Sequence, residues 1–245
     1  MAAMNQQQSK SVISTTRWYL VGLLIILIAA NGMRLYRLTN DDLSSREGYS
    51  IALASLPPDR LFQHLYQNDI NPSLYPVVLR EWFIFGEYIR HLFDTQELQK
   101  NPGKNKHFTM SAPWLNSSWE WSLIPDVYWG RFLSLLFGLG AIVLVFYIGR
   151  HIRDDWVGLM SALLLVFFPS HIRICREITP MTLQMFFLLG AFLCFLKVLN
   201  ESKQEQPQRN QWILPMAGYI LLGVLSITVH LSSLIFLLLL WIWYR

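Results

Sequence analysis

The hydrophobic residues of this chain fall into long runs that are separated by shorter polar stretches. The first run, residues 18–36, follows a polar tail over residues 1–17 and is long enough to cross a hydrocarbon core of ~30 Å. The last run carries no charge from Trp212 to Tyr244 and is too long for one span, so its central Thr228-Val229-His230 predicts an outer turn. The sequence predicts an all-α integral membrane protein of about six transmembrane helices. They cover residues 18–36, 130–148, 156–172, 181–199, 212–229 and 231–244.

A long polar segment, residues 37–129, separates the first two predicted spans. Within it, residues 48–56 alternate polar and apolar side chains at helical spacing and are followed by a pair of prolines that ends the pattern. Residues 77–93 mix aromatic and apolar side chains with Arg80, Glu81, Glu87 and Arg90, which indicates a helix lying in the membrane interface and not crossing it. We therefore expect an outer loop that contains short amphipathic helices.

Composition and the placement of charge agree with a membrane protein. Only 15% of the residues are charged and 53% are hydrophobic, with a mean hydropathy of +0.32, whereas a soluble domain carries about 25% charged residues. The net charge of +4 comes from basic residues beside the apolar runs, which is typical of topology signals and not of nucleic-acid binding. Basic residues precede the first run, follow the second and lie in the linker over residues 200–211. These flanks and both termini are predicted to be cytoplasmic, in a cell membrane.

Several ionisable residues are predicted to lie at the outer ends of the spans, where burying a charge is costly. They are Arg131, Arg173, Arg176, Glu177 and His230. Guanidinium groups at a membrane–water boundary suit a phosphate, which arginine binds through two parallel hydrogen bonds. The alternative is that these arginines extend to the interface or pair with Glu177. His230 suits a metal ligand or a sugar contact, or else an ordinary interfacial histidine.

The outer loop supplies the two carboxylates that are the first candidates for catalysis, Glu47 and Asp69. Of two nearby acids, one can take a proton from an attacking hydroxyl while the other orients a metal ion or a sugar. A solvated loop charge is the alternative for each of them.

A series of short motifs runs along most of the chain in a recognisable order. The motifs are Arg46-Glu47-Gly48-Tyr49-Ser50, Asp69 before Asn71-Pro72-Ser73-Leu74-Tyr75, Arg131-Phe132-Leu133-Ser134 with Gly138, Gly149-Arg150, Pro169-Ser170-His171, Arg176-Glu177-Ile178-Thr179-Pro180 and Thr228-Val229-His230. This series resembles the GT-C membrane glycosyltransferases of the dolichyl-phosphate-mannose-protein mannosyltransferase and aminoarabinose-transferase superfamily.

The resemblance implies an inverting transfer of a hexose or pentose from a polyprenyl-phosphate donor to a lipid, glycan or protein acceptor on the non-cytoplasmic side. A carboxylate of the first outer loop would activate the acceptor hydroxyl, and arginines, often with a divalent metal ion, would steady the leaving phosphate. The implied catalytic residues are Glu47 and Asp69. The implied substrate-binding residues are Arg46, Tyr49, Asn71, Tyr75, Arg131, Arg176, Glu177 and His230.

The chain departs from the superfamily pattern at two functional positions. Arg46 stands where relatives have the catalytic aspartate, and Thr179 stands where they have an arginine. The later spans of the relatives are also absent, so we expect a truncated or degenerate transferase. The alternative is a non-catalytic GT-C-like protein that binds a lipid carrier or a partner subunit. A transporter or channel subunit agrees less well, because the centres of the predicted spans are apolar.

Overall fold

A computed structural model describes residues 2–36, 38, 43–68, 74–93, 127–202 and 212–244, and this part of the chain is helical, without strands. The prediction of an all-α protein is therefore confirmed. The helices are α1 (Ala2–Leu35), α2 (Ser45–Ala54), α3 (Pro58–Asn68), α4 (Leu74–Phe93), α5 (Val127–Ile152), α6 (Asp155–Phe167), α7 (Pro169–Arg176), α8 (Pro180–Ser202), α9 (Ile213–Val229) and α10 (Ser233–Tyr244).

The predicted count of about six spans is not confirmed for the described helices. Three of them are long and apolar enough to cross a membrane: the Trp18–Leu35 part of α1, all of α5, and Pro180–Glu201 of α8. The bent pair of α6 and α7 would make a fourth. Helices α9 and α10 are apolar but shorter, because the turn near His230 divides the long run into two short pieces.

The expected span over residues 156–172 does not continue as one straight helix. Helix α6 ends at Phe167, and α7 leaves in a direction that differs by 64°. Phe168 between them has extended backbone angles, and Pro169 begins α7 at a position where its missing N–H costs nothing. A proline inside a straight helix would lose a backbone hydrogen bond and clash with the preceding turn, so the chain bends here.

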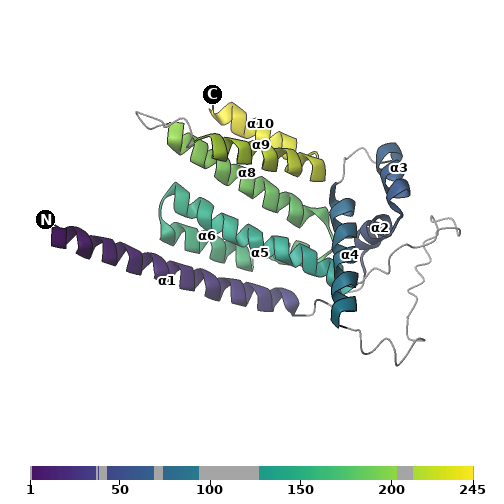
Figure 1. Cartoon of the computed structure of the whole chain (residues 1–245), viewed down its shortest axis with the longest axis horizontal. Coiled ribbons are helices and arrows are strands. Elements are labelled where there is room, and N and C mark those ends of the chain that lie inside the picture. The colour runs from purple at the N-terminus through teal and green to yellow at the C-terminus, as the bar shows by residue number, and fades with distance from the viewer. Residues whose placement is uncertain are drawn as a thin grey trace.

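The helices form a bundle with a second layer across one end. Helices α1, α5, α6, α8 and α9 run side by side, while α4 crosses the end of the bundle with α2 and α3 beside it (Figure 1). Helix α5 is central, because it packs against α1, α4, α6, α7 and α8. The expected interfacial helix is α4, which is not among the candidate spans and lies across their ends.

Two apolar clusters hold these layers together. One lies inside the bundle, where Ala30 of α1 packs with Phe146 of α5 and Val166 of α6. The other joins the crossing layer to the bundle, since Tyr75 and Leu79 of α4 pack against Ile178 and other buried residues of α2, α5 and α8. The N-terminal part of α4 is thus fixed against the bundle by its buried side.

A pair of stacked tryptophans fixes the other side of α4 against the start of α5. The rings of Trp82 and Trp129 are parallel, with centroids 4.8 Å apart. Each indole N–H donates to the backbone carbonyl of the other residue, at 2.8 and 2.9 Å. Gly86 leaves room for the Trp129 ring, because a Cβ at residue 86 would lie 2.3 Å from Nε1 of that indole. These contacts set the position of α4 at the end of the bundle.

The hairpin of α5 and α6 depends on two glycines at its closest approach. A Cβ on Gly149 would lie 2.8 Å from the Cα of Gly158, and one on Gly158 would lie 2.5 Å from the carbonyl oxygen of Phe146. Both neighbours are backbone atoms, which a rotamer change cannot move. The turn is completed by Asp154, whose side chain caps α6 by accepting from the N–H of Val157 at 2.8 Å.

We expect Gly158→Ala to destabilise the protein by roughly 1–3 kcal/mol, because the added methyl group forces two packed helices apart. The measurement is the apparent melting temperature in detergent micelles, followed by tryptophan fluorescence. The matched control is Gly32→Ala, since a Cβ there meets nothing within 4 Å. Equal melting temperatures for the two variants would contradict the close packing of the hairpin.

Candidate functional site

Glu47 lies at the start of α2, where the sequence Ser44-x-x-Glu47 forms a capping box. The hydroxyl of Ser44 accepts from the N–H of Glu47 at 3.3 Å, and the Glu47 carboxylate accepts from the N–H of Ser44 at 3.0 Å. These reciprocal bonds satisfy two backbone donors that no helical partner can reach. The helix therefore begins with its carboxylate held at the bundle end.

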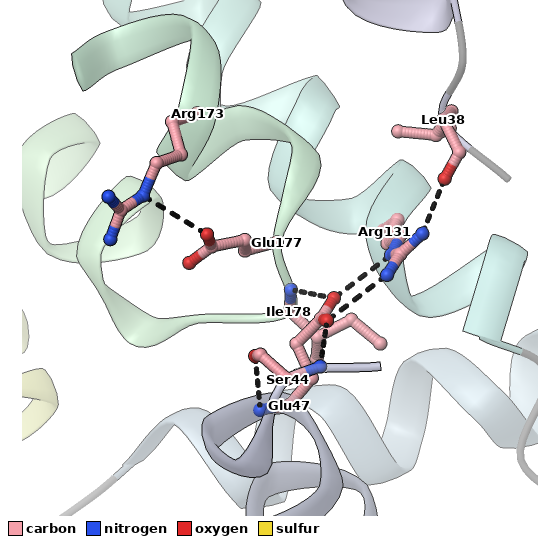
Figure 2. A network of polar contacts seen from close by, with 7 residues as sticks. All are labelled: Leu38, Ser44, Glu47, Arg131, Arg173, Glu177 and Ile178. Carbon is pink, nitrogen blue, oxygen red and sulfur yellow. Dashed lines mark hydrogen bonds and ion pairs between the residues drawn. The ribbon is translucent and has the colours of Figure 1, made fainter. Parts of the chain in front are cut away.

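The same carboxylate is bound by Arg131 of α5 and by the turn between α7 and α8 (Figure 2). Arg131 donates from Nε to Oε1 at 2.9 Å and from its terminal nitrogen to Oε2 at 3.1 Å. The N–H of Ile178 donates to Oε1 at 3.0 Å. Arg131 also donates to the carbonyl of Leu38, which follows α1. Four parts of the chain therefore meet at this single ion pair.

Glu47 and Arg131 are both buried, with 1% and 3% of their side chains exposed. Burial alone would raise the pKa of Glu47, but hydrogen bonds from Arg131, Ser44 and Ile178 outweigh it and hold the pKa below its ordinary value. The carboxylate is thus ionised and accepts four hydrogen bonds. Its predicted catalytic role stays a prediction. The contacts themselves are structural, because they hold separate segments of the chain together.

The turn that follows α7 carries a second and more open ion pair. The Nε of Arg173 donates to Oε1 of Glu177 at 3.2 Å, one helical turn further along (Figure 2). Their side chains are 74% and 26% exposed. Glu177 has extended backbone angles at the end of α7, and Pro180 begins α8 three residues later.

Two cavities meet at this pair. The smaller, about 430 Å³, is lined by Glu47, Arg131, Arg173, Arg176 and Glu177 together with Ser44, Pro169 and Ile172. The larger, about 880 Å³, lies between α2, the start of α4, α7, the start of α8 and the turn after α9. Arg173 and Glu177 line both cavities and so form the boundary between them.

The structure places most of the predicted site residues around these two cavities. Five of them line the larger cavity: Arg46, Tyr49, Tyr75, Glu177 and His230. Glu47, Arg131 and Arg176 line the smaller one. Asp69 and Asn71 lie outside the described residues. Residues that are far apart in the sequence are therefore brought together at one end of the bundle.

One wall of the larger cavity is a polar cluster between α8, α9 and α10 that sequence reasoning missed. The amide of Gln184 donates to the hydroxyls of Ser232 and Ser233 at 2.8 and 2.9 Å. The N–H of Ser232 donates to Nδ1 of His230 at 3.2 Å, so a neutral His230 carries its proton on Nε2 and is a donor. A glutamine in the apolar run over residues 181–199 was the available signal.

A buried arginine at the end of α1 also escaped the sequence reasoning. Arg34 is fully buried, and it donates to the carbonyl of Ala30 at 3.0 Å and to Nδ1 of His171 at 2.8 Å. A basic residue near the outer end of a span, opposite the side that such residues prefer, was the signal for it. The contact ties α1 to α7.

The donor atoms of the described residues do not fit a divalent metal ion. No three His, Cys, Asp or Glu residues in the described ranges are grouped closely enough to hold one. Glu47 is committed to four hydrogen bonds, and Glu177 is bound to Arg173. The predicted metal ion stays a prediction.

Comparison with protein families gives a match over the C-terminal part of the chain. Residues 103–244, more than half of the chain, match the model of the dolichyl-phosphate-mannose-protein mannosyltransferases. The chain belongs to this family. Neither the curated proteins nor the solved structures give a match.

Membership of the mannosyltransferase family confirms the resemblance and supports a multi-pass GT-C membrane glycosyltransferase in general terms. The matched region contains Arg131, Arg176, Glu177 and His230, whereas Glu47 and the rest of α2 precede it.

We expect Glu47→Gln to destabilise this mannosyltransferase-family chain by about 3–5 kcal/mol, because it leaves the Arg131 guanidinium buried without its counter-charge. The measurement is the apparent melting temperature and the monodisperse fraction in detergent. Glu177→Gln is the matched control, since it breaks an exposed pair worth about 0–1 kcal/mol. A Glu47→Gln protein as stable as the control would contradict the structural role of the buried pair.

The lowered pKa of Glu47 predicts a dependence of stability on pH. Because its folded-state pKa lies below the ordinary 4.5, the pair contributes fully above that value and is lost as the pH falls through the folded-state pKa. We therefore expect the difference in melting temperature between the unsubstituted protein and Glu47→Gln to be constant near neutral pH and to shrink below pH 4.5. A difference that stays constant into strong acid would contradict the assignment.

Proposed function

We propose that this chain is a membrane glycosyltransferase that transfers a sugar from a polyprenyl-phosphate donor to an acceptor on the non-cytoplasmic side of a cell membrane. One observation carries the proposal: an arginine-lined cavity and a larger hydroxyl-rich cavity share a boundary at the end of a membrane bundle. Family membership supports the general activity. The donor, the acceptor side and the assignment of the cavities are the proposal's own.

The smaller cavity suits the donor phosphate. Its lining has three arginines and two glutamates, which leaves a net positive charge for an anion. Arg173 and Arg176 lie one turn apart at the end of α7, and arginine binds phosphate oxygens through parallel, charge-assisted hydrogen bonds. Phe167 and Phe168 are exposed just before Pro169 of this cavity, and their apolar surface suits a polyprenyl chain that remains in the lipid.

The larger cavity suits the sugar and the attacking hydroxyl of the acceptor. Tyr49 and Tyr75 offer aromatic surface and hydroxyl groups, and Gln184 and His230 offer further polar groups for a sugar. Burial raises the pKa of Tyr75 far above its usual value, so its hydroxyl stays protonated and can donate. The anomeric carbon then lies at the boundary, with its phosphate in one cavity and its sugar ring in the other.

The chemistry is a single displacement with inversion. The acceptor hydroxyl attacks the anomeric carbon from the side opposite the phosphate, while the bond from that carbon to the phosphate oxygen breaks. The guanidinium groups of Arg173 and Arg176 are bound to the phosphate before the bond breaks, so they stabilise the negative charge that grows on the leaving phosphate. The position of these groups depends on the Glu47–Arg131 pair, which holds the start of the turn after α7.

The orientation follows from the other end of the bundle. The last turn of α5 carries Arg150, and Arg153 follows it in the turn to α6, which lies at the same end as the N-terminus of α1, away from α4 (Figure 1). Basic turns favour the cytoplasmic side. The cavities at the α4 end therefore face the opposite side of the membrane, and the N-terminus lies inside.

A second candidate function is a non-catalytic protein that binds the lipid carrier. The observation that favours it is that Glu47 is committed to its structural bonds, and the resemblance described above places Arg46 where relatives have the catalytic aspartate. Such a protein would bind polyprenyl phosphate in the arginine-lined cavity without consuming a donor.

We expect Arg176→Gln to lower turnover of dolichyl-phosphate mannose in membranes by about 10- to 150-fold, because a charge-assisted hydrogen bond worth roughly 1.5–3 kcal/mol is lost. The assay counts labelled mannose that leaves the donor, whether it passes to any acceptor or to water. Arg150→Gln is the matched control, because Arg150 pairs with Asp155 at the opposite end of the bundle. Donor binding without any turnover in the unsubstituted protein would favour the second candidate.

A further inference from the structure

We propose that Glu177 is the general base of the transfer and that Arg173 holds its carboxylate until the donor phosphate takes Arg173 away. This inference rests on the proposed function and deepens it, because it assigns the proton acceptor that the Arg46 position no longer supplies. It also gives the exposed Arg173–Glu177 pair a role in the order of events.

The general base of the transfer has to come from the carboxylates that line the two cavities. Among the described residues that line the two cavities, Glu47 and Glu177 are the acidic ones. Glu47 is 1% exposed and accepts from Ser44, Ile178 and twice from Arg131. A proton placed on it would break the buried pair and leave Arg131 with an uncompensated charge, which costs several kcal/mol. Glu47 is therefore a poor proton acceptor during a reaction.

Glu177 is more exposed and more weakly paired than Glu47. Its carboxylate is partly exposed, lines both cavities, and accepts from Arg173 at 3.2 Å. An exposed ion pair of this kind contributes only about 0–1 kcal/mol. A phosphate group in the smaller cavity offers the Arg173 guanidinium a better-matched, bidentate partner. The exchange of partners therefore costs little, and it leaves the Glu177 carboxylate without the guanidinium that had occupied it.

The position of the Glu177 side chain also suits a general base. The backbone of the turn is held at Ile178, directly after Glu177, by the hydrogen bond to Glu47 (Figure 2). The Glu177 side chain thus projects from a fixed point at the boundary where the anomeric carbon is proposed to lie. An acceptor hydroxyl that enters from the larger cavity meets the carboxylate and the anomeric carbon together. Hydrogen-bond reach of this kind is what a general base requires.

The proposed step balances as follows. The acceptor oxygen forms its bond to the anomeric carbon, and the hydroxyl proton passes to the Glu177 carboxylate. The bond from the anomeric carbon to the phosphate oxygen breaks, and its electron pair stays with the polyprenyl phosphate on Arg173 and Arg176. After the products leave, Glu177 returns its proton to water and pairs with Arg173 again.

The experiment measures turnover of labelled dolichyl-phosphate mannose by the full chain in membranes, with Glu177→Gln compared with the unsubstituted protein. Loss of a positioned general base lowers the rate by about 10²–10⁴-fold. We expect this loss in kcat, with KM for the donor changed less than about threefold, because glutamine keeps the shape of the side chain but accepts no proton. Glu177→Asp should recover part of the rate, and Glu177→Gln should melt with the unsubstituted protein.

Arg173→Gln separates the two parts of the proposal. It removes a phosphate ligand but leaves the Glu177 carboxylate, so we expect a raised donor KM and a smaller loss in kcat than in Glu177→Gln. A loss confined to Asp69→Asn, with full turnover in Glu177→Gln, would overturn the assignment and leave the proposed function intact. Absence of any donor turnover in the unsubstituted protein would overturn the proposed function and this inference with it.

Discussion

The buried ion pair between Glu47 and Arg131 is the interaction on which the rest of the architecture depends. Its two side chains connect the start of α2, the centre of the bundle at α5, the residue after α1 and the turn between α7 and α8. Removing two charges from water is expensive, and the arrangement is stable only because nearly every lone pair and donor finds a partner. The outer layer and the bundle are thereby held in one register.

This constraint distinguishes a carboxylate that holds the structure together from one that is able to take up a proton. Glu47 cannot take up a proton without weakening the ion pair that connects four parts of the chain. Glu177 has the opposite properties: its side chain is partly exposed and its partner, Arg173, binds it weakly. It lies one residue before Ile178, whose N–H is bound to Glu47. Arg46, the residue before Glu47, lines the larger cavity together with Glu177 and adds a positive charge to it.

The long apolar runs made the bundle predictable, because the hydrocarbon core fixes the length of a crossing helix. Helices α5 and α8 begin or end within a few residues of the expected spans. The proline at residue 169 was evident in the sequence, but the bend was not predicted, because a proline can also lie within a kinked span. The Glu47–Arg131 pair joins residues 84 positions apart, and no local pattern specifies which of several arginines a loop carboxylate will reach.

The bend at Pro169 decides which residues line the two cavities. A straight helix would carry residues 169–176 outward by about 12 Å at 1.5 Å per residue, into the headgroup layer and away from α2. The 64° turn lays this segment across the end of the bundle instead. Arg173, Arg176 and Glu177 then line cavities that Glu47 and Arg46 also line, although more than 120 residues separate the two groups in the sequence. The buried contact from Arg34 to His171 binds α7 itself, and the hydrogen bond from Ile178 to Glu47 binds the turn that follows it. A proline and two buried arginines thus convert an expected span into the wall of a site.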